Sequence, residues 1–174
     1  VLVASGGGTA ALTDVTTNKI VARIPVGART RAVAIAPDGT RGYVAAGRRI
    51  AAIDLGARAV VAGVSAGGGV TALAVSEDGQ RLYAARRGAI DVVDAPTMTL
   101  RASIALGSRA SGAALAVSSD ATHAVVVLDA KHVGVVDLVR FRLARRVTLG
   151  GATGAAFALT GPNAYVATRE RSGS

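Results

Sequence analysis

Short apolar runs of four to eight residues follow one another along the chain, separated by polar or glycine-containing turns. The first complete group of runs is RAVAIA (31–36), RGYVAA (41–46), RIAAID (49–54) and AVVAGV (59–64). Runs of this length, bounded by Gly, Asp or Pro, predict β-strands. No amphipathic run of helical length with start and stop signals interrupts them. The pattern therefore predicts an all-β protein.

The first run of each group alternates larger apolar residues with alanine. Val33 and Ile35 alternate with Ala32 and Ala34, and the alternation returns at 72–75 and 114–117. Successive side chains of a strand point to opposite faces, so small side chains line one face of each of these strands. Small side chains suit an innermost strand, where neighbouring sheets converge.

The groups recur at a nearly constant spacing. Glycines that end each group, at 27, 67, 107 and 150, are 40, 40 and 43 residues apart, and aspartates at 14, 54, 94 and 137 keep the same spacings. A unit of about 40 residues with four strands is the period of a β-propeller blade. A single blade cannot bury both faces of its sheet, so blades must stack around an axis. We therefore expect β-propeller blades of four antiparallel strands over residues 1–168, in units near 1–27, 28–67, 68–107, 108–150 and 151–168, followed by a tail at 169–174.

The strand count leaves two ways to build the ring. Val3 aligns with Tyr43, so the chain begins in the second strand of a unit, and it ends with first and second strands at 155–160 and 164–168. This gives 17 strands, one more than a closed ring of about four blades needs. Either the ring closes by displacing one strand, or the chain is a segment of a larger propeller, which we favour. The end blades of a segment expose strand edges that promote self-association.

Two hairpins share one turn. APDGTRGYVAAG (36–47) and SEDGQRLYAARRG (76–88) both place Asp-Gly between two apolar runs. Asp-Gly favours a hairpin because Gly adopts positive φ without steric cost. The matching positions in the next two units hold Ser119-Asp120 and Gly161-Pro162, which predicts other turn types there.

The composition removes several kinds of chemistry. Hydrophobic residues make up 51% of the chain but aromatic residues only 3%, so close packing of small side chains must build the core. The absence of Cys excludes disulfides, zinc–thiolate sites and thiol nucleophiles. The apolar runs are too short, and too often broken by Gly, Arg or Asp, to predict a transmembrane segment.

The sequence carries no catalytic motif. His123 and His132 lie on different predicted elements, whereas a catalytic triad needs a base that a third group positions. No acidic cluster or His pair has the spacing of metal ligands. The glycine clusters at 6–8 and 67–69 lack the following helix and Lys of a phosphate loop. We assign no catalytic, cofactor-binding or metal-binding residue and expect no cofactor, and we expect the repeated aspartates to bond turn amides.

Charge gives the candidate site. The chain carries 20 Lys and Arg against 11 Asp and Glu, a formal net charge of +9. In a propeller, the turns between first and second strands share a face with those between third and fourth strands. That face receives eight of the eleven carboxylates: Asp14, Asp38, Asp54, Glu77, Asp78, Asp94, Asp120 and Asp137. The other face receives the candidate anion- or partner-binding residues: Arg29, Arg31, Arg48, Arg49, Arg86, Arg87, Arg109, Lys131 and His132.

A clustered positive face attracts anions through its field and through bidentate Arg contacts. Proteins that bind single-stranded nucleic acid usually add aromatic stacking, and few aromatic residues are available here. The sequence therefore favours a protein or an anionic polymer as the partner and argues against nucleic acid.

The stretch PDGTRGYVAAG…IAAIDLGARAVVAGVSAG resembles the YVTN-type β-propeller repeat, and residues 1–27 resemble it over their second half. The resemblance covers nearly the whole chain. It implies a propeller of the kind found in surface-layer and other extracellular proteins of archaea and bacteria, and hence an extracellular or periplasmic location. The signature residues of the repeat are turn and packing positions, so the resemblance transfers no catalytic residue.

Together these observations lead us to expect a non-enzymatic repeat scaffold with a basic binding face. The alternative is part of an enzyme propeller, lactonase-like or quinone-dependent dehydrogenase-like, whose catalytic residues lie outside this segment.

Overall fold

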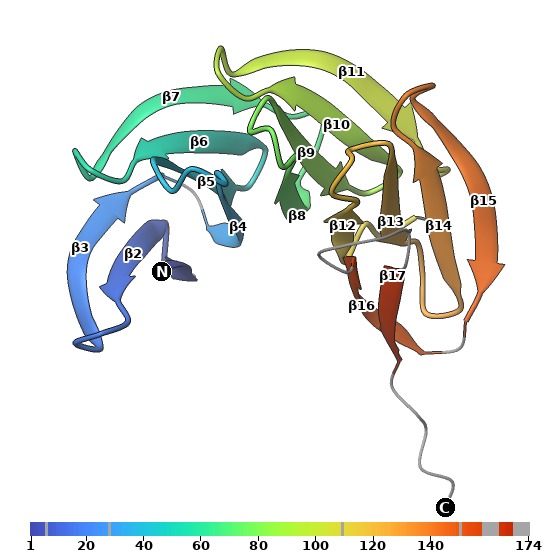
Figure 1. Ribbon diagram of the computed structural model, residues 1–174, viewed down its shortest axis with the longest axis horizontal. Helices are drawn as coiled ribbons and strands as arrows, with labels where there is room; N and C mark the ends of the chain where they lie inside the picture. The colour runs from blue at the N-terminus through green and yellow to red at the C-terminus, as the bar shows by residue number, and fades with distance from the viewer. Residues whose placement is uncertain (6, 28, 109, 150, 158–163, 169–174) are drawn as a thin grey trace, which may run out of the picture.

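The computed structural model describes residues 1–174 except 6, 28, 109, 150, 158–163 and 169–174. All regular structure in the described residues is β-strand, in five antiparallel sheets placed side by side along an arc (Figure 1). We number these sheets as blades 1 to 5. The predicted all-β propeller architecture is confirmed.

Blades 2, 3 and 4 are complete four-stranded sheets, and each runs in chain order from an inner to an outer strand. The strands are β1 (Leu2–Ser5), β2 (Thr9–Asp14) and β3 (Lys19–Pro25) in blade 1; β4 (Thr30–Ile35), β5 (Arg41–Ala46), β6 (Arg49–Asp54) and β7 (Ala59–Ser65) in blade 2; β8 (Val70–Val75), β9 (Arg81–Arg86), β10 (Ala89–Asp94) and β11 (Thr99–Ala105) in blade 3; β12 (Leu115–Val117), β13 (His123–Val127), β14 (His132–Asp137) and β15 (Arg142–Thr148) in blade 4; and β16 (Ala152–Phe157) and β17 (Ala164–Thr168) in blade 5.

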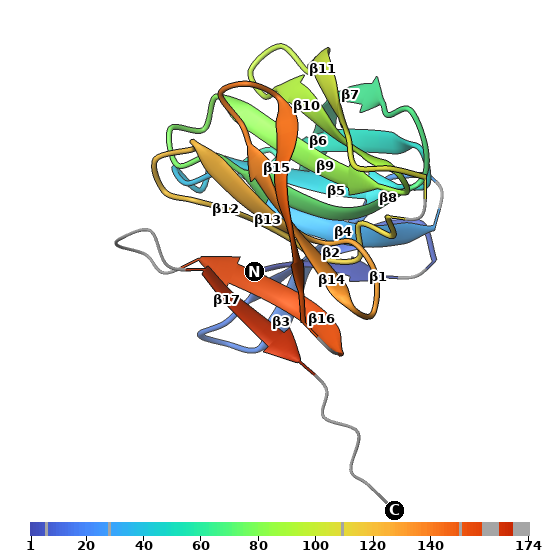
Figure 2. The ribbon, with the colours of Figure 1, turned by 90° about the vertical axis from the view of Figure 1, so that its right-hand side faces the viewer.

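The arc formed by this chain is open. Its two incomplete sheets, blade 1 with three strands and blade 5 with two, lie at opposite ends of the arc (Figure 1). The inner strands β4, β8, β12 and β16 follow one another along its concave side, and the outer strands form a convex rim (Figures 1 and 2). Both β1 and β17 are second strands of a blade, and a ring of four blades would need only one of them. Neither displaces the other, because β1 is paired with β2 and β17 with β16. This chain therefore does not form the closed ring in which one strand is displaced.

Apolar layers between neighbouring blades hold the arc together. Leu2 and Ile24 of blade 1 pack with Val44 and Ile53 of blade 2, and separate clusters of the same kind lie between each following pair of blades. Each fully buried Ile, Leu or Val contributes about 1.5–3 kcal/mol relative to an exposed one. Ala and Val dominate these layers, which explains how a chain with so few aromatic residues builds its core.

One turn differs from expectation. Gly39 and Gly79 take φ of 70° and 69° and close their hairpins by donating N–H to the carbonyls of Ala36 and Ser76. Ala121 takes φ of 53° and makes the same bond to Ser118, so the turn around Ser119-Asp120 repeats the Asp-Gly geometry. The prediction of another turn type was wrong there. The hairpin retains the hydrogen bond that closes the turn, although Ala121 must adopt a positive φ to make it. Gly161-Pro162 lies outside the described residues.

The inner strand of blade 4 is shorter than its counterparts, with three residues against six in β4 and β8. Gly112, which comes before it, has φ of 63°, and its carbonyl accepts the Thr71 hydroxyl of β8 at 2.7 Å. A Cβ at Gly112 would lie 2.9 Å from the carbonyl oxygen of Arg86. This segment therefore crosses close over blade 3 instead of extending the sheet of blade 4.

Candidate functional site

Backbone hydrogen bonds sort the turns onto two faces. In each complete blade, the residue after the third strand donates its N–H to the residue before the second strand: Leu55 to Thr40, Ala95 to Gln80 and Leu138 to Thr122. On the opposite face, the residue after the fourth strand donates to the residue before the third: Ala66 to Arg48, Leu106 to Gly88 and Leu149 to Lys131. We call these the acidic-turn face and the basic-turn face.

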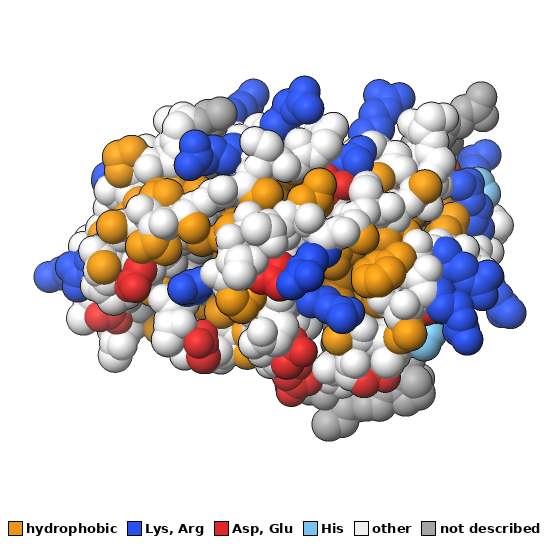
Figure 3. Space-filling model, turned by 90° about the horizontal axis from the view of Figure 1, so that it is seen from above, with side chains coloured by type: hydrophobic (Ala, Val, Ile, Leu, Met, Phe, Trp, Pro, Cys, Tyr) orange, Lys and Arg blue, Asp and Glu red, His pale blue; other side chains and the backbone are white. Residues whose placement is uncertain are grey.

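Most of the predicted binding residues lie exposed on the basic-turn face. They come from the turns or strand ends there: Arg29, Arg31, Arg48, Arg49, Arg87 and Lys131. In Figure 3, which looks onto the rim, Lys and Arg side chains line the upper edge and most visible carboxylates lie in the lower half. The structure therefore brings these six cations to one side of the arc. Arg109 lies outside the described residues.

Arg86 differs from the other predicted residues because its charge is already compensated. Its Nε donates to Asp91 Oδ2 at 2.9 Å, and its Nη2 donates to Ser103 Oγ at 3.0 Å. Only 19% of its side chain is exposed. We therefore remove Arg86 from the cations available to a partner and treat it as part of the interior of blade 3.

Asp91 is the partner that sequence reasoning missed. It is buried in β10 and also accepts the Ser103 hydroxyl at 2.7 Å and the Gly67 N–H at 2.8 Å. Burial alone would raise its pKa, but the bonds from Arg86, Ser103 and Gly67 outweigh burial and lower it. The equivalent positions in blades 2 and 4 hold Ala51 and Gly134. A carboxylate inside an apolar run, where the repeat elsewhere has a small residue, was the available signal.

His132 is also engaged. Its Nδ1 lies 2.9 Å and 3.0 Å from the two carboxylate oxygens of Asp129; Asp129 lies in the turn between β13 and β14, and His132 is the first residue of β14. The Lys131 N–H, which also bonds this carboxylate, and His132 hold the pKa of Asp129 below its usual value. His132 is therefore occupied by a contact within its own hairpin, and we do not count it among the cations available to a partner.

The repeated aspartates act in the turns, as predicted. Each accepts a backbone N–H two or three residues further on: Thr16 to Asp14, Ala57 to Asp54, Thr97 to Asp94 and Arg140 to Asp137, at 2.7–3.0 Å. The Thr97 hydroxyl, Arg101 and the Thr97 N–H lower the pKa of Asp94 to about 2. Carboxylates held ionised in this way are poor general acids near neutral pH.

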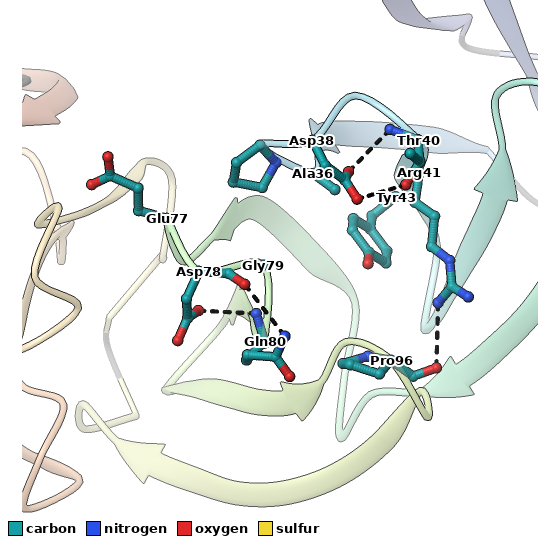
Figure 4. A pocket seen from close by; sticks show the side chains of 11 residues that line it. Ala36, Asp38, Thr40, Arg41, Tyr43, Glu77, Asp78, Gly79, Gln80 and Pro96 are labelled. Carbon is teal, nitrogen blue, oxygen red and sulfur yellow. Dashed lines mark hydrogen bonds between the residues drawn. The ribbon is translucent and has the colours of Figure 1, made fainter.

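A cavity of about 340 Å³ opens on the acidic-turn face between blades 2 and 3 (Figure 4). Asp38 accepts the Thr40 N–H and hydroxyl at 3.0 Å and 2.9 Å, and Asp78 accepts the Gln80 N–H at 2.9 Å. Arg41 reaches across to the carbonyl of Pro96 at 3.3 Å. Both aspartates thus accept hydrogen bonds from residues of their own turns. They do not form an acid–base pair in this cavity. Among the described residues, no group of three His, Cys, Asp or Glu side chains is placed to hold a metal ion.

Within the described part of the chain, no helix is long and apolar enough to cross a membrane. No family model and no curated protein matches the sequence.

Solved structures do match, in 1217 chains, so the fold alone does not select a function. One of them is Kuenenia stuttgartiensis hydrazine synthase, with 22% sequence identity and a TM-score of 0.79. The alignment covers 86% of this chain and 45% of that chain, so this chain spans less than half the length of the protein it resembles. At this identity the likeness shows the fold that the two chains share.

Proposed function

We propose that this chain belongs to a YVTN-type repeat propeller that acts as a non-enzymatic binding scaffold and presents its basic-turn face to a partner. The partner is an anionic polymer or an acidic protein surface, and the location is extracellular or periplasmic. The location and the repeat type rest on the sequence resemblance. The partner class rests on the distribution of charge.

The observation that carries the proposal is the excess of exposed cations over carboxylates on the basic-turn face. Asp91 is buried against Arg86, and Asp129 is bonded to the amides of its own turn and to His132. Eight other carboxylates lie in turns of the opposite face. The six exposed cations therefore outnumber Asp129, the one carboxylate among the described residues of this face that is not paired with the mostly buried Arg86, and they create a net positive field.

The cations also repeat along the arc. Arg48, Arg87 and Lys131 stand in the turn between second and third strands of three successive blades. A ligand with negative charges repeated along its length can contact several blades at once, and linked contacts bind more tightly than one alone. Sulfated or phosphorylated polymers have this chemistry.

The experiment replaces Arg48, Arg49 and Arg87 with Ser and measures the salt concentration that elutes the protein from a heparin column. The matched control replaces Arg58, Arg140 and Arg142, which lie at or beside turns of the acidic-turn face, and removes the same net charge. We expect a lower elution salt for the first variant and little change for the control. An equal decrease in both variants would show that retention follows net charge alone and would overturn the proposed face.

A further inference from the structure

A second concave site lies on the rim, away from the basic-turn face. A groove of about 450 Å³ between blades 3 and 4 is lined by Arg81, Val92, Asp94, Arg101, Ala102 and Phe141, together with Gln80. Pockets that hold small ligands have volumes of roughly 300–1,000 Å³ and combine apolar walls with a few polar groups. Figure 3 shows cationic side chains bordering exposed apolar ones in the middle of the rim. Both blades that form the groove are complete sheets.

Phe141 occupies a position that does not suit an aromatic residue. It has φ of 52°, in the left-handed region that bulky side chains rarely adopt. The same turn position holds Asn18, Arg58 and Met98 in the other blades, so the turn itself requires no ring. The Phe141 side chain is 39% exposed and lines the groove. The left-handed φ belongs to this turn in blades 1 to 4, so blade 4 is distinguished by the aromatic side chain that the turn places at the groove.

Arg81 supplies the charge beside this ring. Its guanidinium carbon lies 6.0 Å from the centroid of the Phe141 ring, within cation–π range. No salt bridge joins Arg81 to a carboxylate among the described residues. The second cation, Arg101, is neutralised because its Nε and Nη2 donate to Asp94 Oδ2 at 3.2 Å and 2.7 Å. The groove thus offers, next to one aromatic ring, one cation that makes no salt bridge among the described residues and interacts with the Asp78 carboxylate only at longer range.

Both carboxylate oxygens of Asp94 already accept hydrogen bonds. Its Oδ1 accepts the Thr97 N–H at 3.0 Å and the Thr97 hydroxyl. Ala102 and the almost fully buried Val92 form the apolar wall of the groove. A ligand with a flat apolar body and one negative charge matches this set, because a second charge would meet Asp94 without a free cation.

We propose that this groove binds a small planar aromatic carboxylate, with its ring against Phe141 and the apolar wall and its carboxylate on Arg81. The site is independent of the basic-turn face and of the function proposed for that face. Arg81 acts by a charge-assisted hydrogen bond, and Phe141 acts by offset or edge-to-face contact with the ligand ring.

The test titrates benzoate, benzamide and acetate into the isotope-labelled chain and follows amide chemical shifts by NMR. Benzamide keeps the ring without the charge, and acetate keeps the charge without the ring. We expect benzoate to bind most tightly and to shift the amides that surround the groove. We expect Arg81→Gln to weaken benzoate binding roughly tenfold and to abolish the preference over benzamide.

The second variant, Phe141→Asn, introduces a residue that tolerates the left-handed region and that the chain already uses at Asn18, so the fold is retained. It should weaken benzoate about fivefold and leave acetate unchanged. Arg58→Gln removes one cation from the equivalent turn of blade 2 and should leave benzoate binding unaltered. Equal binding of benzoate and acetate, no benzoate binding, or benzoate binding unaffected by both groove variants would overturn the proposal.

Discussion

Arg86 and Asp91 form an ion pair inside blade 3, with 2.9 Å between Arg86 Nε and Asp91 Oδ2 and 1% of the aspartate side chain exposed. Asp91 also holds the Gly67 N–H, so the pair ties the third strand of blade 3 to the turn that leads into its first strand. Blade 2 has Ala46 and Ala51 at the equivalent positions and still forms a complete four-stranded sheet. The pair is therefore compatible with this fold but not required by it.

Replacing Asp91 with Ala leaves the mostly buried Arg86 charge without a carboxylate partner. Removing one member of a buried ion pair costs about 3–5 kcal/mol, and we expect a loss of this size in the free energy of unfolding by urea. The double variant Arg86→Ala with Asp91→Ala recreates the pair found in blade 2 and should recover much of the loss. A double variant no more stable than Asp91→Ala would contradict this account.

The turn at Ala121 can be relaxed. Its φ of 53° costs a non-glycine residue roughly 1–2 kcal/mol, while glycine adds about 0.5–1 kcal/mol of unfolded-state entropy. We therefore expect Ala121→Gly to stabilise the protein by about 0.5–1 kcal/mol in thermal or urea unfolding. Gly39→Ala, at the equivalent position with φ of 70°, serves as the reverse experiment and should destabilise. A loss of stability in the Ala121 variant would count against the shared turn geometry.

Stability should fall in acid through the turn aspartates. The pKa values of Asp94 and Asp120 are lowered from 3.8 to about 2 by side-chain and backbone hydrogen bonds in their turns. The folded state therefore binds protons less readily than the unfolded chain, and stability present above about pH 4 is lost as the pH falls towards 2. Urea midpoints across this range measure the effect. Asp94→Asn should flatten the curve, and an unchanged slope would remove Asp94 as a source of the acid sensitivity.

The open arc should self-associate. In the described structure β17 pairs only with β16, so one edge of β17 carries unpaired backbone groups, and Tyr165 on this strand is 64% exposed. Such edges and apolar patches promote association. Analytical ultracentrifugation should show oligomers that Tyr165→Lys reduces. Val139→Lys, at an equally exposed apolar residue in a turn of blade 4, is the control. A concentration-independent monomer would contradict the prediction.

The repeat made most of the fold readable from sequence. The four strands expected at 31–64 appear within one residue of their observed ends, because each run is short, apolar and closed by turn residues. The sorting of turns onto two faces followed from the same order. The alternation at 114–117 also located β12 (Leu115–Val117), but not the path of the chain before it, which depends on Gly112 approaching the carbonyl of Arg86, a contact between blades.

The site was harder to predict from sequence. Which charged side chains pair depends on how the strands are aligned in space, and a count of charged residues gives no information on that alignment. Arg86 and Arg87 are adjacent in sequence, yet one turns inward to Asp91 and the other is exposed. The groove beside Phe141 depends on two blades whose facing residues, Arg81 and Phe141, lie sixty positions apart. A strand pattern predicts neither relationship.

The division of apolar side chains into separate layers between blades makes the molecule modular. Each layer belongs to two adjacent sheets, so the cohesion of the arc is a sum of nearest-neighbour terms and not the property of one shared interior. A substitution in one layer perturbs that junction and leaves the next intact. Individual blades can therefore hold different chemistry, such as the buried charge of blade 3 or the aromatic turn of blade 4, at little expense to the rest of the arc.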